Sequence, residues 1–159
     1  MKNSKQTASA GEGRRVVNEM RLRLPALSQN EGVARGTVGA FLAQLDPTVE
    51  ELADLKCVVS EAVTNCVVHA YGGRGGAIYI TVRARADREV EISVRDHGCG
   101  IANVRQAMQP MFTTDKSGER SGMGFAVMQA FSDRVRVLSA VGKGTKVTVI
   151  KRLSPAGEL

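Results

Sequence analysis

Val58-Val59-Ser60-Glu61-Ala62-Val63-Thr64-Asn65 combines an apolar helical stripe with two polar side chains, and this stretch decides the fold. Glu61 and Asn65 are four residues apart, so on an α-helix they project from the same side, one turn from each other. A carboxylate can take a proton from an attacking hydroxyl, and an amide oxygen is a hard neutral ligand that suits Mg²⁺. The stretch therefore predicts a helix that buries one face and presents this pair to a cavity. Taken singly, each of the two residues also fits an ordinary helix surface.

Three glycine-containing segments accompany the pair. They are Asp96-His97-Gly98-Cys99-Gly100, Gly122-Met123-Gly124 and Gly142-Lys143-Gly144-Thr145. Glycine lacks a Cβ, so such backbone can approach phosphate groups and a base closely. Gly122 and Gly124 open a predicted helix, where free N–H groups and the macrodipole favour an anionic phosphate. A single Gly-x-Gly is a weak signal, but the four segments together predict a pocket for Mg²⁺ and ATP.

Other polar residues are candidates for the same pocket. Asp96 follows an apolar strand, so its carboxylate can reach inward, although an isolated Asp-x-Gly more often only closes a turn. Lys116, Arg120 and Ser121 can add charge and hydrogen bonds to a triphosphate, unless they form a solvated lid surface. Thr145 can reach phosphate or can be an ordinary β-branched strand residue. For Asp96 the other segments outweigh the turn interpretation, whereas both interpretations stay open for Lys116, Arg120, Ser121 and Thr145.

The hydrophobic pattern predicts helices over one face of a sheet. Strands are expected at 20–24, 77–85, 90–95, 135–139 and 146–152, and helices at 28–45, 46–70, 104–108 and 122–131. Ser28 and Glu31 form a capping-box pattern at the first helix, and Asp46 with Pro47 is expected to begin the second. The long polar stretch 101–121 is expected to have a function. The predicted fold class is an α/β (α+β) two-layer sandwich with a mixed, mainly antiparallel sheet.

Length and composition limit the class of protein. A chain of 159 residues with 43% hydrophobic residues is sufficient for one domain with an ordinary core. No apolar run is long enough to cross a bilayer, and residues 1–15 contain no signal-peptide core. Three cysteines without a paired spacing do not indicate a disulfide framework. We therefore expect a cytoplasmic protein with reduced thiols.

The net charge of +6 is compatible with nucleic-acid binding. Part of this charge lies near the N-terminus, however, and the chain has no tryptophan and only 4% aromatic residues to stack on bases. A solvated surface with positive charge near a nucleotide or an acidic protein partner fits the distribution better. We predict no direct nucleic-acid contact and no membrane contact.

A zinc site is a rival interpretation of two segments. Cys66 and His69, with His97 and Cys99, offer two sulfurs and two nitrogens. The one-residue gap in the second pair suits a closed tetrahedral site poorly, and Cys66 falls on the predicted apolar stripe. A buried cysteine is the preferred interpretation. The chain also lacks a P-loop motif and a Gly-x-Ser-x-Gly elbow, so it does not match the enzyme classes that those motifs mark.

The four segments, in this order, resemble the N, G1, G2 and G3 boxes of the ATPase superfamily that includes gyrase, the Hsp90 chaperones, histidine kinases and MutL. Longer strings are similar to the sporulation anti-sigma F factor family, and the likeness runs from about Asn18 to Leu153. These strings are Ala26-Leu27-Ser28-Gln29-Asn30-Glu31, Ala43-Gln44-Leu45-Asp46-Pro47-Thr48, the stretch 58–65, Pro110-Met111-Phe112-Thr113-Thr114 and Glu119-Arg120-Ser121-Gly122-Met123-Gly124-Phe125. The resemblance implies a Bergerat-type ATP-binding fold in which Glu61 is the catalytic base, Asn65 binds magnesium and Asp96 accepts a hydrogen bond from the adenine amino group.

The resemblance also sets the extent of the domain and of the site. The nucleotide-binding candidates are Asn65, Asp96, Gly98, Gly100, Thr114, Lys116, Arg120, Ser121, Gly122, Met123, Gly124 and Thr145. We expect a disordered leader at 1–17, the domain at 18–153 and a tail at 154–159. Because residues 17–20 resemble the family's own beginning, translation starts either at Met1 or near Val17 or Met20.

The activity that the resemblance implies involves several partners. It describes a homodimeric ATP-dependent protein serine kinase that holds the sporulation sigma F factor inactive and phosphorylates a serine of an anti-anti-sigma factor. Glu31 and Arg35 match family residues that face the sigma factor near the dimer interface, and they also fit a plain i,i+4 surface ion pair. Three alternatives stay open: a general-stress anti-sigma serine kinase of the same fold, a stand-alone ATPase in which Glu61 activates water, and a basic nucleic-acid binder.

Overall fold

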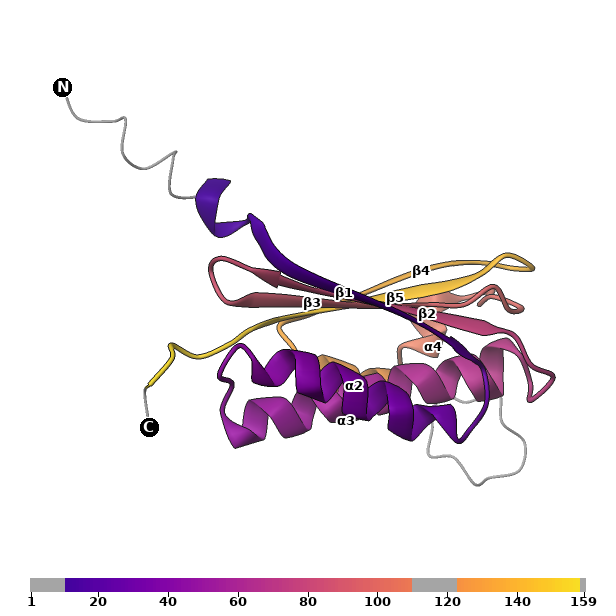
Figure 1. The fold of residues 1–159 in the computed structure, drawn as a ribbon. Helices are drawn as coiled ribbons and strands as arrows, with labels where there is room; N and C mark the ends of the chain where they lie inside the picture. The colour runs from indigo at the N-terminus through magenta and orange to yellow at the C-terminus, as the bar shows by residue number, and fades with distance from the viewer. Residues whose placement is uncertain (1–10, 110–122, 158–159) are drawn as a thin grey trace.

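The computed structural model describes residues 11–109 and 123–157, which form a sheet layer and a helix layer (Figure 1). The strands are β1 (Val16–Pro25), β2 (Ala77–Arg85), β3 (Glu89–Arg95), β4 (Arg134–Ala140) and β5 (Gly144–Arg152). The helices are α2 (Asn30–Ala43), α3 (Val49–Asn65), α4 (Val104–Ala107) and α5 (Gly124–Ala130), and a π-helical turn, η1 (Cys66–Ala70), follows α3 directly. The predicted two-layer α+β class is confirmed. In the described part of the chain, no helix is long and apolar enough to span a bilayer.

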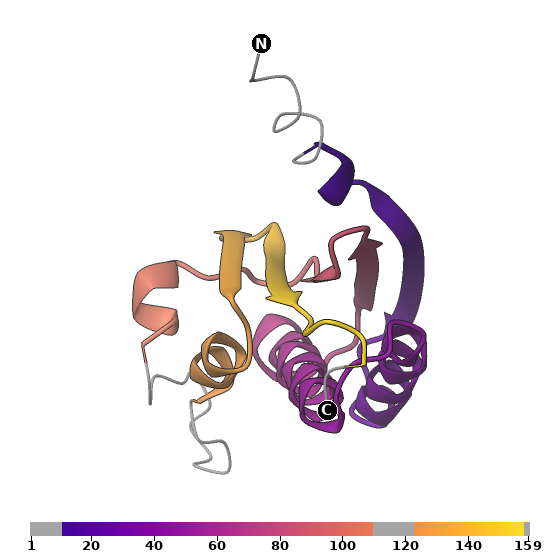
Figure 2. The same ribbon diagram turned by 90° about the vertical axis from the view of Figure 1, so that its left-hand side faces the viewer.

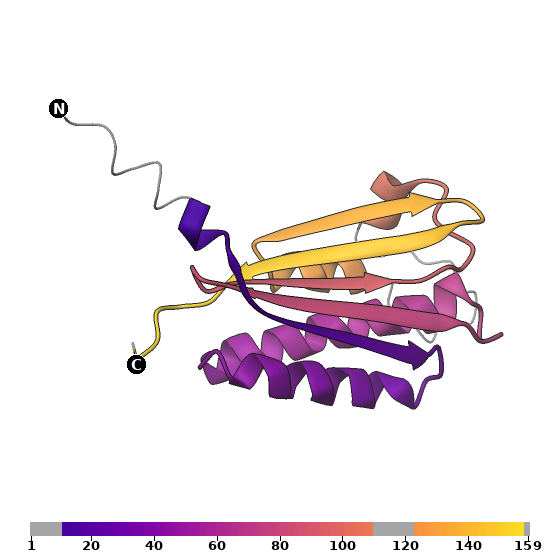
Figure 3. The same ribbon diagram turned by 45° about the horizontal axis from the view of Figure 1, so that its top comes forward.

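The strands lie in the order β1-β2-β3-β5-β4, and each neighbouring pair is antiparallel (Figure 3). The sequence predicted a mixed, mainly antiparallel sheet, whereas no parallel pair occurs among these described strands. The hairpin of β4 and β5 explains the difference. It places β5 between β3 and β4, and these two strands, which run in the same direction, are therefore not neighbours.

The core lies between the sheet and the helices α2, α3 and α5, which cover one face of the sheet (Figure 2). Alternate residues of β2 and β3 point into it, namely Ile78, Ile80, Val82, Ala84, Val90, Ile92 and Val94. α3 contributes the stripe Leu55, Val58, Val59, Ala62 and Val63. Burial of this stripe fixes the rotation of α3, and with it the direction in which Glu61 and Asn65 project.

The cap of α3 is Thr48, not Asp46 as the sequence analysis predicted. Thr48 Oγ1 accepts a hydrogen bond from the N–H of Glu51 at 3.1 Å, and the Glu51 carboxylate accepts one from the N–H of Thr48 at 2.9 Å. Asp46 has a φ of 50° and lies in the turn before the helix, and Pro47 precedes the cap instead of occupying the first helical position. The Thr48-x-x-Glu51 spacing of a capping box was present in the sequence and was missed.

The capping box predicted for Ser28 and Glu31 is also wrong. α2 begins at Asn30, and its N-cap residue Gln29 makes no side-chain hydrogen bond to the helix. The Glu31 carboxylate instead accepts a hydrogen bond from the Ser60 hydroxyl on α3. The Glu31 side chain, which the local pattern predicted to cap α2, therefore binds the neighbouring helix α3 instead.

The sheet begins earlier than predicted, at Val16 instead of Met20. The carbonyl of Arg15 accepts a hydrogen bond from the N–H of Ala86 at 2.9 Å, in the turn between β2 and β3. The last residues of the expected leader are therefore attached to the sheet. The predicted boundaries of leader, domain and tail stay a prediction.

We predict that Thr48→Ala lowers the free energy of unfolding by about 1 kcal/mol, because it removes the side-chain acceptor at the start of α3. Urea denaturation followed by circular dichroism measures this loss. Ser28→Ala is the matched control: the Ser28 side chain is exposed and is not a helix cap, so the change should be close to zero. An equal loss in both variants would contradict this assignment of the cap.

Candidate active site

The polar pair of α3 lies beside the first residue of α5. A Cβ built on Gly124 would be 3.2 Å from Glu61 Oε2 and 3.3 Å from Asn65 Oδ1. The Nδ2 atom of Asn65 is buried and has no hydrogen-bond partner among the described residues. The structure therefore brings the Glu61–Asn65 pair together with Gly124 of the predicted Gly122-Met123-Gly124 segment. The Asn65 amide keeps hydrogen-bonding capacity that the described residues do not use.

Asp96 is the buried carboxylate of the site, with 5% of its surface exposed. Its Oδ1 accepts hydrogen bonds from the N–H of Gly98 at 2.9 Å and from the N–H of Thr145 at 3.2 Å. Its Oδ2 accepts one from the Cys66 thiol at 3.6 Å. Asp96 thus joins the end of β3, the start of β5 and the π-helical turn, and it does more than close the turn at its own position.

The Cys66 thiol is a donor in this arrangement. Burial raises the pKa of this thiol well above its ordinary value, and the neighbouring Asp96 carboxylate raises the pKa further. The thiol is therefore protonated at neutral pH and can donate to Asp96 Oδ2. The predicted burial of Cys66 in the core is confirmed. Its contact with Asp96 was not predicted, because the two residues are 30 positions apart.

Three predicted glycines are required by chain packing. A Cβ on Gly98 would lie 2.3 Å from the carbonyl oxygen of Ala70, one on Gly100 would lie 2.1 Å from that of Ala140, and one on Gly144 would lie 2.2 Å from that of Asp96. Gly100 and Gly144 also have positive φ angles, of 72° and 110°. From the sequence, these glycines were expected to let the backbone approach a ligand. The structure gives the direct reason, which is close contact between loops around Asp96.

Thr145 is buried at the start of β5, with its Oγ1 atom 2.8 Å from Ser139 Oγ. Ser139 Oγ also accepts a hydrogen bond from the N–H of Ile101 at 2.8 Å. This serine holds the loop after Gly100 against the β4–β5 hairpin. Ser139 was not predicted, since a serine on the inward side of an edge strand has no distinctive pattern in the sequence.

Tyr71 is a second supporting residue that the sequence did not reveal. Its hydroxyl donates a hydrogen bond to the carbonyl of Ala77 at 2.7 Å and accepts one from the N–H of His97 at 2.8 Å. It therefore ties the glycine-rich turn before β2 to the segment that follows β3.

The remaining nucleotide-binding candidates lie in the sequence between Thr114 and Gly124. Thr114, Lys116, Arg120, Ser121 and Gly122 lie outside the described residues. Met123 is the N-cap residue of α5, and Gly124 is the first residue of that helix.

The four residues of the rival zinc interpretation do not converge on one site, although the Cys99 thiol donates a hydrogen bond to the carbonyl of His69 at 3.2 Å. The Cys66 thiol contacts Asp96 in the core, whereas the His97 ring packs edge-on against Tyr79, with 5.5 Å between ring centroids. Within 11–109 and 123–157, no group of three or more His, Cys, Asp or Glu side chains is placed to hold a metal ion.

The predicted partner-facing residues lie on α2. Arg35 is 48% exposed, and its guanidinium is 3.5 Å from the Glu31 carboxylate. Glu31 also accepts the Ser60 hydrogen bond, one residue before Glu61. The two residues form the i,i+4 pair that the spacing predicted, and Arg35 presents its charge to solvent.

Comparison with known proteins agrees with this geometry. A sequence model of the histidine kinase-like ATPase domain family matches residues 24–151. The chain is 52% identical over 143 residues to the anti-sigma F factor of Anoxybacillus flavithermus, an alignment that covers 89% of this chain and 97% of that protein. It is 51% identical over 143 residues, with the same coverage, to the anti-sigma F factor of Bacillus thuringiensis.

Solved structures show the same fold. The RsbU and RsbW domains of a Mycobacterium tuberculosis protein superpose with a TM-score of 0.65 at 23% identity, over 90% of this chain and 35% of that chain. Full-length ShkA in complex with AMPPNP superposes with a TM-score of 0.55 at 18% identity, over 94% of this chain and 34% of that chain. The chain belongs to the histidine kinase-like ATPase domain family and, within it, to the anti-sigma F factors.

Proposed function

We propose that this anti-sigma factor binds Mg-ATP, transfers the γ-phosphoryl group to a serine of an anti-anti-sigma factor, and holds the sporulation sigma F factor inactive. It would act as a homodimer in the cytoplasm. The observation that carries the kinase proposal is the placement of Glu61 and Asn65 beside Gly124, directly before Cys66, whose thiol contacts the buried carboxylate of Asp96. The names of the similar proteins support the sigma partner.

Asp96 is suited to select adenine. Its Oδ1 is held by two backbone N–H groups, but among the described residues Oδ2 has only the weak donor Cys66. An ionised carboxylate has about four acceptor positions, so Oδ2 retains capacity for the exocyclic amino group of the base. The backbone bonds would fix the orientation of the carboxylate before ATP binds.

Asn65 is suited to hold Mg²⁺. Its Oδ1 atom faces the start of α5, and its Nδ2 atom makes no hydrogen bond among the described residues, so the fold leaves this amide uncommitted. An amide oxygen is a ligand that Mg²⁺ accepts while it keeps several waters. Bound Mg²⁺ would neutralise charge on the phosphate oxygens during transfer.

Glu61 is the proposed catalytic base. Its carboxylate would accept the proton of the substrate serine hydroxyl as the serine oxygen bonds to the γ-phosphorus. The bond between that phosphorus and the bridging oxygen breaks, and ADP is released. The one-turn spacing from Asn65 places the base beside the proposed magnesium ligand.

Glu61→Gln tests the base. The amide keeps the shape and reach of the side chain but cannot take the proton, so we expect phosphoryl transfer to fall by roughly a hundredfold or more while Mg-ATP still binds. The assay follows labelled γ-phosphate onto the anti-anti-sigma protein, and free phosphate is counted in parallel. Phosphoryl transfer by the variant at the rate of the unmodified protein would show that Glu61 is not the catalytic base. Release of free phosphate without protein labelling by the unmodified protein would favour the stand-alone ATPase.

Asp96→Asn tests the nucleotide site. Asn can keep one oxygen for the Gly98 and Thr145 N–H groups, so the fold should survive, but its other edge now donates and should reject the adenine amino group. We expect the affinity for ATP, measured by calorimetry, to fall by about tenfold or more. Asp54→Asn is the control, with the same charge change roughly 16 Å along α3 from Asn65. Unchanged affinity for ATP in a folded Asp96→Asn variant would show that the adenine ring binds elsewhere.

Arg35→Glu tests the sigma surface. Charge reversal on the exposed side of α2 should abolish binding of sigma F in a pull-down of purified proteins. It should leave kinase activity intact, because Arg35 lies on α2, whereas Asn65 is on α3 and Asp96 follows β3. Arg74→Glu, on an exposed turn, is the matched control. If Arg35→Glu retains sigma F binding, the partner surface is not on this helix. If the unmodified protein binds a general-stress sigma factor in place of sigma F, the sporulation assignment fails.

A further inference from the structure

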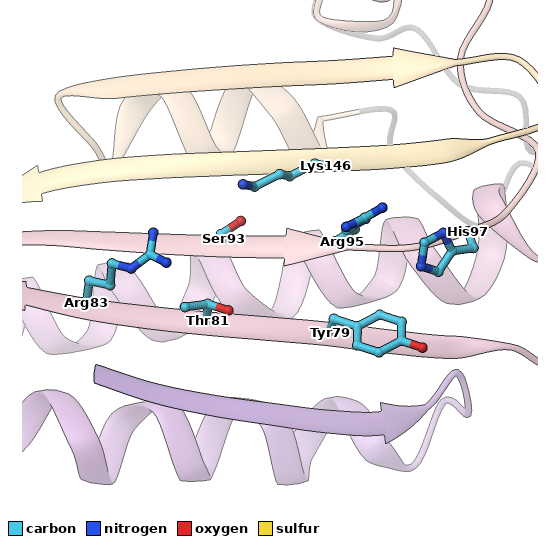
Figure 4. A pocket seen from close by; sticks show the side chains of 7 residues that line it. All are labelled: Tyr79, Thr81, Arg83, Ser93, Arg95, His97 and Lys146. Atoms are coloured by element: carbon cyan, nitrogen blue, oxygen red, sulfur yellow. The ribbon is translucent and has the colours of Figure 1, made fainter. Parts of the chain in front are cut away.

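The face of the sheet that the helices do not cover is strongly basic. We call it the outer face. Its cations, on alternate strand positions, are Arg21, Arg23, Arg83, Arg85, Arg95, Arg134, Arg136, Lys146 and Arg152, and its carboxylates are Glu19, Glu89 and Glu91. Figure 4 shows part of this face, with the helices behind the sheet. The excess of cations on one face explains where much of the positive charge of the chain lies.

At one end of the outer face, the carboxylates on β1 and β3 are paired with arginines. Arg83 lies 2.6 Å from the Glu19 carboxylate and 3.0 Å from the Glu91 carboxylate. Arg85 lies 2.8 Å from Glu91, and Arg152 is 2.7 Å from Asp87. Burial alone would raise the pKa of Glu91, but hydrogen bonds from Arg85 and Arg83 lower it below its ordinary value. Glu89 lies 3.4 Å from Arg85 and 3.5 Å from Arg152, so the carboxylates of the outer face are already occupied.

At the other end, no such partner of a cation occurs in the described part of the chain. Strand pairing aligns Arg23 with Tyr79, Tyr79 with Arg95, and Arg95 with Lys146 in a single row across the sheet. We call Arg23, Arg95 and Lys146 the basic row. None of the three forms an ion pair with a carboxylate among the described residues. Arg95 and Lys146 are direct cross-strand neighbours, an arrangement of like charges that destabilises a sheet.

A shallow depression lies beside the basic row (Figure 4). Tyr79, Thr81, Arg83, Ser93, Arg95, His97 and Lys146 line it. Ser93, which is only 6% exposed, and Thr81 come from adjacent strands and face each other in the pairing register. The depression therefore combines hydroxyl groups with flanking cations, a set of donors that suits carboxylate oxygens.

We propose that the basic row and this depression form a docking site for an acidic segment of a partner protein. Carboxylate side chains of that segment would bind Arg95 and Lys146 and would remove the repulsion between them. A second copy of this chain is a poor occupant, because the free charges on both faces would be positive. Single-stranded nucleic acid is also disfavoured, because the Arg23 guanidinium already lies over the Tyr79 ring at 5.7 Å and His97 packs against that ring.

The direct test uses fluorescein-labelled decaglutamate and the full chain, with fluorescence anisotropy at one fixed, low ionic strength. The double variant Arg95→Glu, Lys146→Glu should weaken binding by about tenfold or more. The control Arg74→Glu, Arg105→Glu makes the same charge change at exposed positions away from the outer face and should weaken binding by less than about threefold.

Three outcomes would overturn the proposal. They are the absence of binding by the unmodified chain, an equal loss in the control variant, and tighter binding of decathymidylate or phosphatidylserine vesicles that the Arg95→Glu, Lys146→Glu variant abolishes. The last would assign the same face to nucleic acid or to a lipid surface.

A second measurement does not depend on the double variant. Lys146→Thr removes one charge of the like pair and places a β-branched residue in the strand, so without peptide its midpoint of thermal unfolding should be higher than that of the unmodified chain. Added decaglutamate should raise the midpoint of the unmodified chain more than that of Lys146→Thr, since binding stabilises the folded state. A lower midpoint of thermal unfolding for Lys146→Thr, or equal shifts of the midpoint with peptide, would show that Arg95 and Lys146 are not a repulsive pair available to an acidic peptide.

Discussion

The hydrogen bonds from the backbone of Gly98 and Thr145 to one oxygen of Asp96 hold the site together. A carboxylate that is almost fully buried must be hydrogen-bonded, because leaving its charge unsatisfied costs several kcal/mol. This requirement brings the turn after β3 onto the start of β5 and the Cys66 thiol onto the other oxygen. The crowding at Gly98 and Gly144 is a consequence of that convergence.

The sequence predicted most of the strands, the α3 stripe and the polar pair, because these depend on periodicity within one element. It failed where a neighbouring element competes for a side chain. Glu31 has good local capping chemistry at Ser28, yet Ser60 on another helix takes its carboxylate. Asp46 and Thr48 are both acceptable caps, and the glutamate at position 51 decides between them.

Long-range contacts were equally hidden in the sequence. The bond between Cys66 and Asp96, and the position of Ser139 beside Thr145, follow from which strands are neighbours, and this order is not written in any local pattern. The same holds for the charges of the outer face. Composition gives their sum, but only the strand register shows that the cations near Glu19 and Glu91 are paired and that Arg95 and Lys146 stand side by side.

The π-helical turn after Asn65 has a consequence for chain length. Its hydrogen bond runs from the N–H of Tyr71 to the carbonyl of Cys66, five residues back, so the turn holds one more residue than an α-helical turn would. That extra residue directs the Ala70 carbonyl to the N–H of Cys99 at 2.9 Å. Deleting one residue from 66–70 would let the helix continue regularly and rotate Ala70 by about 100°. The number of residues in this turn, which a substitution cannot change, therefore helps to align α3 with the carboxylate of Asp96.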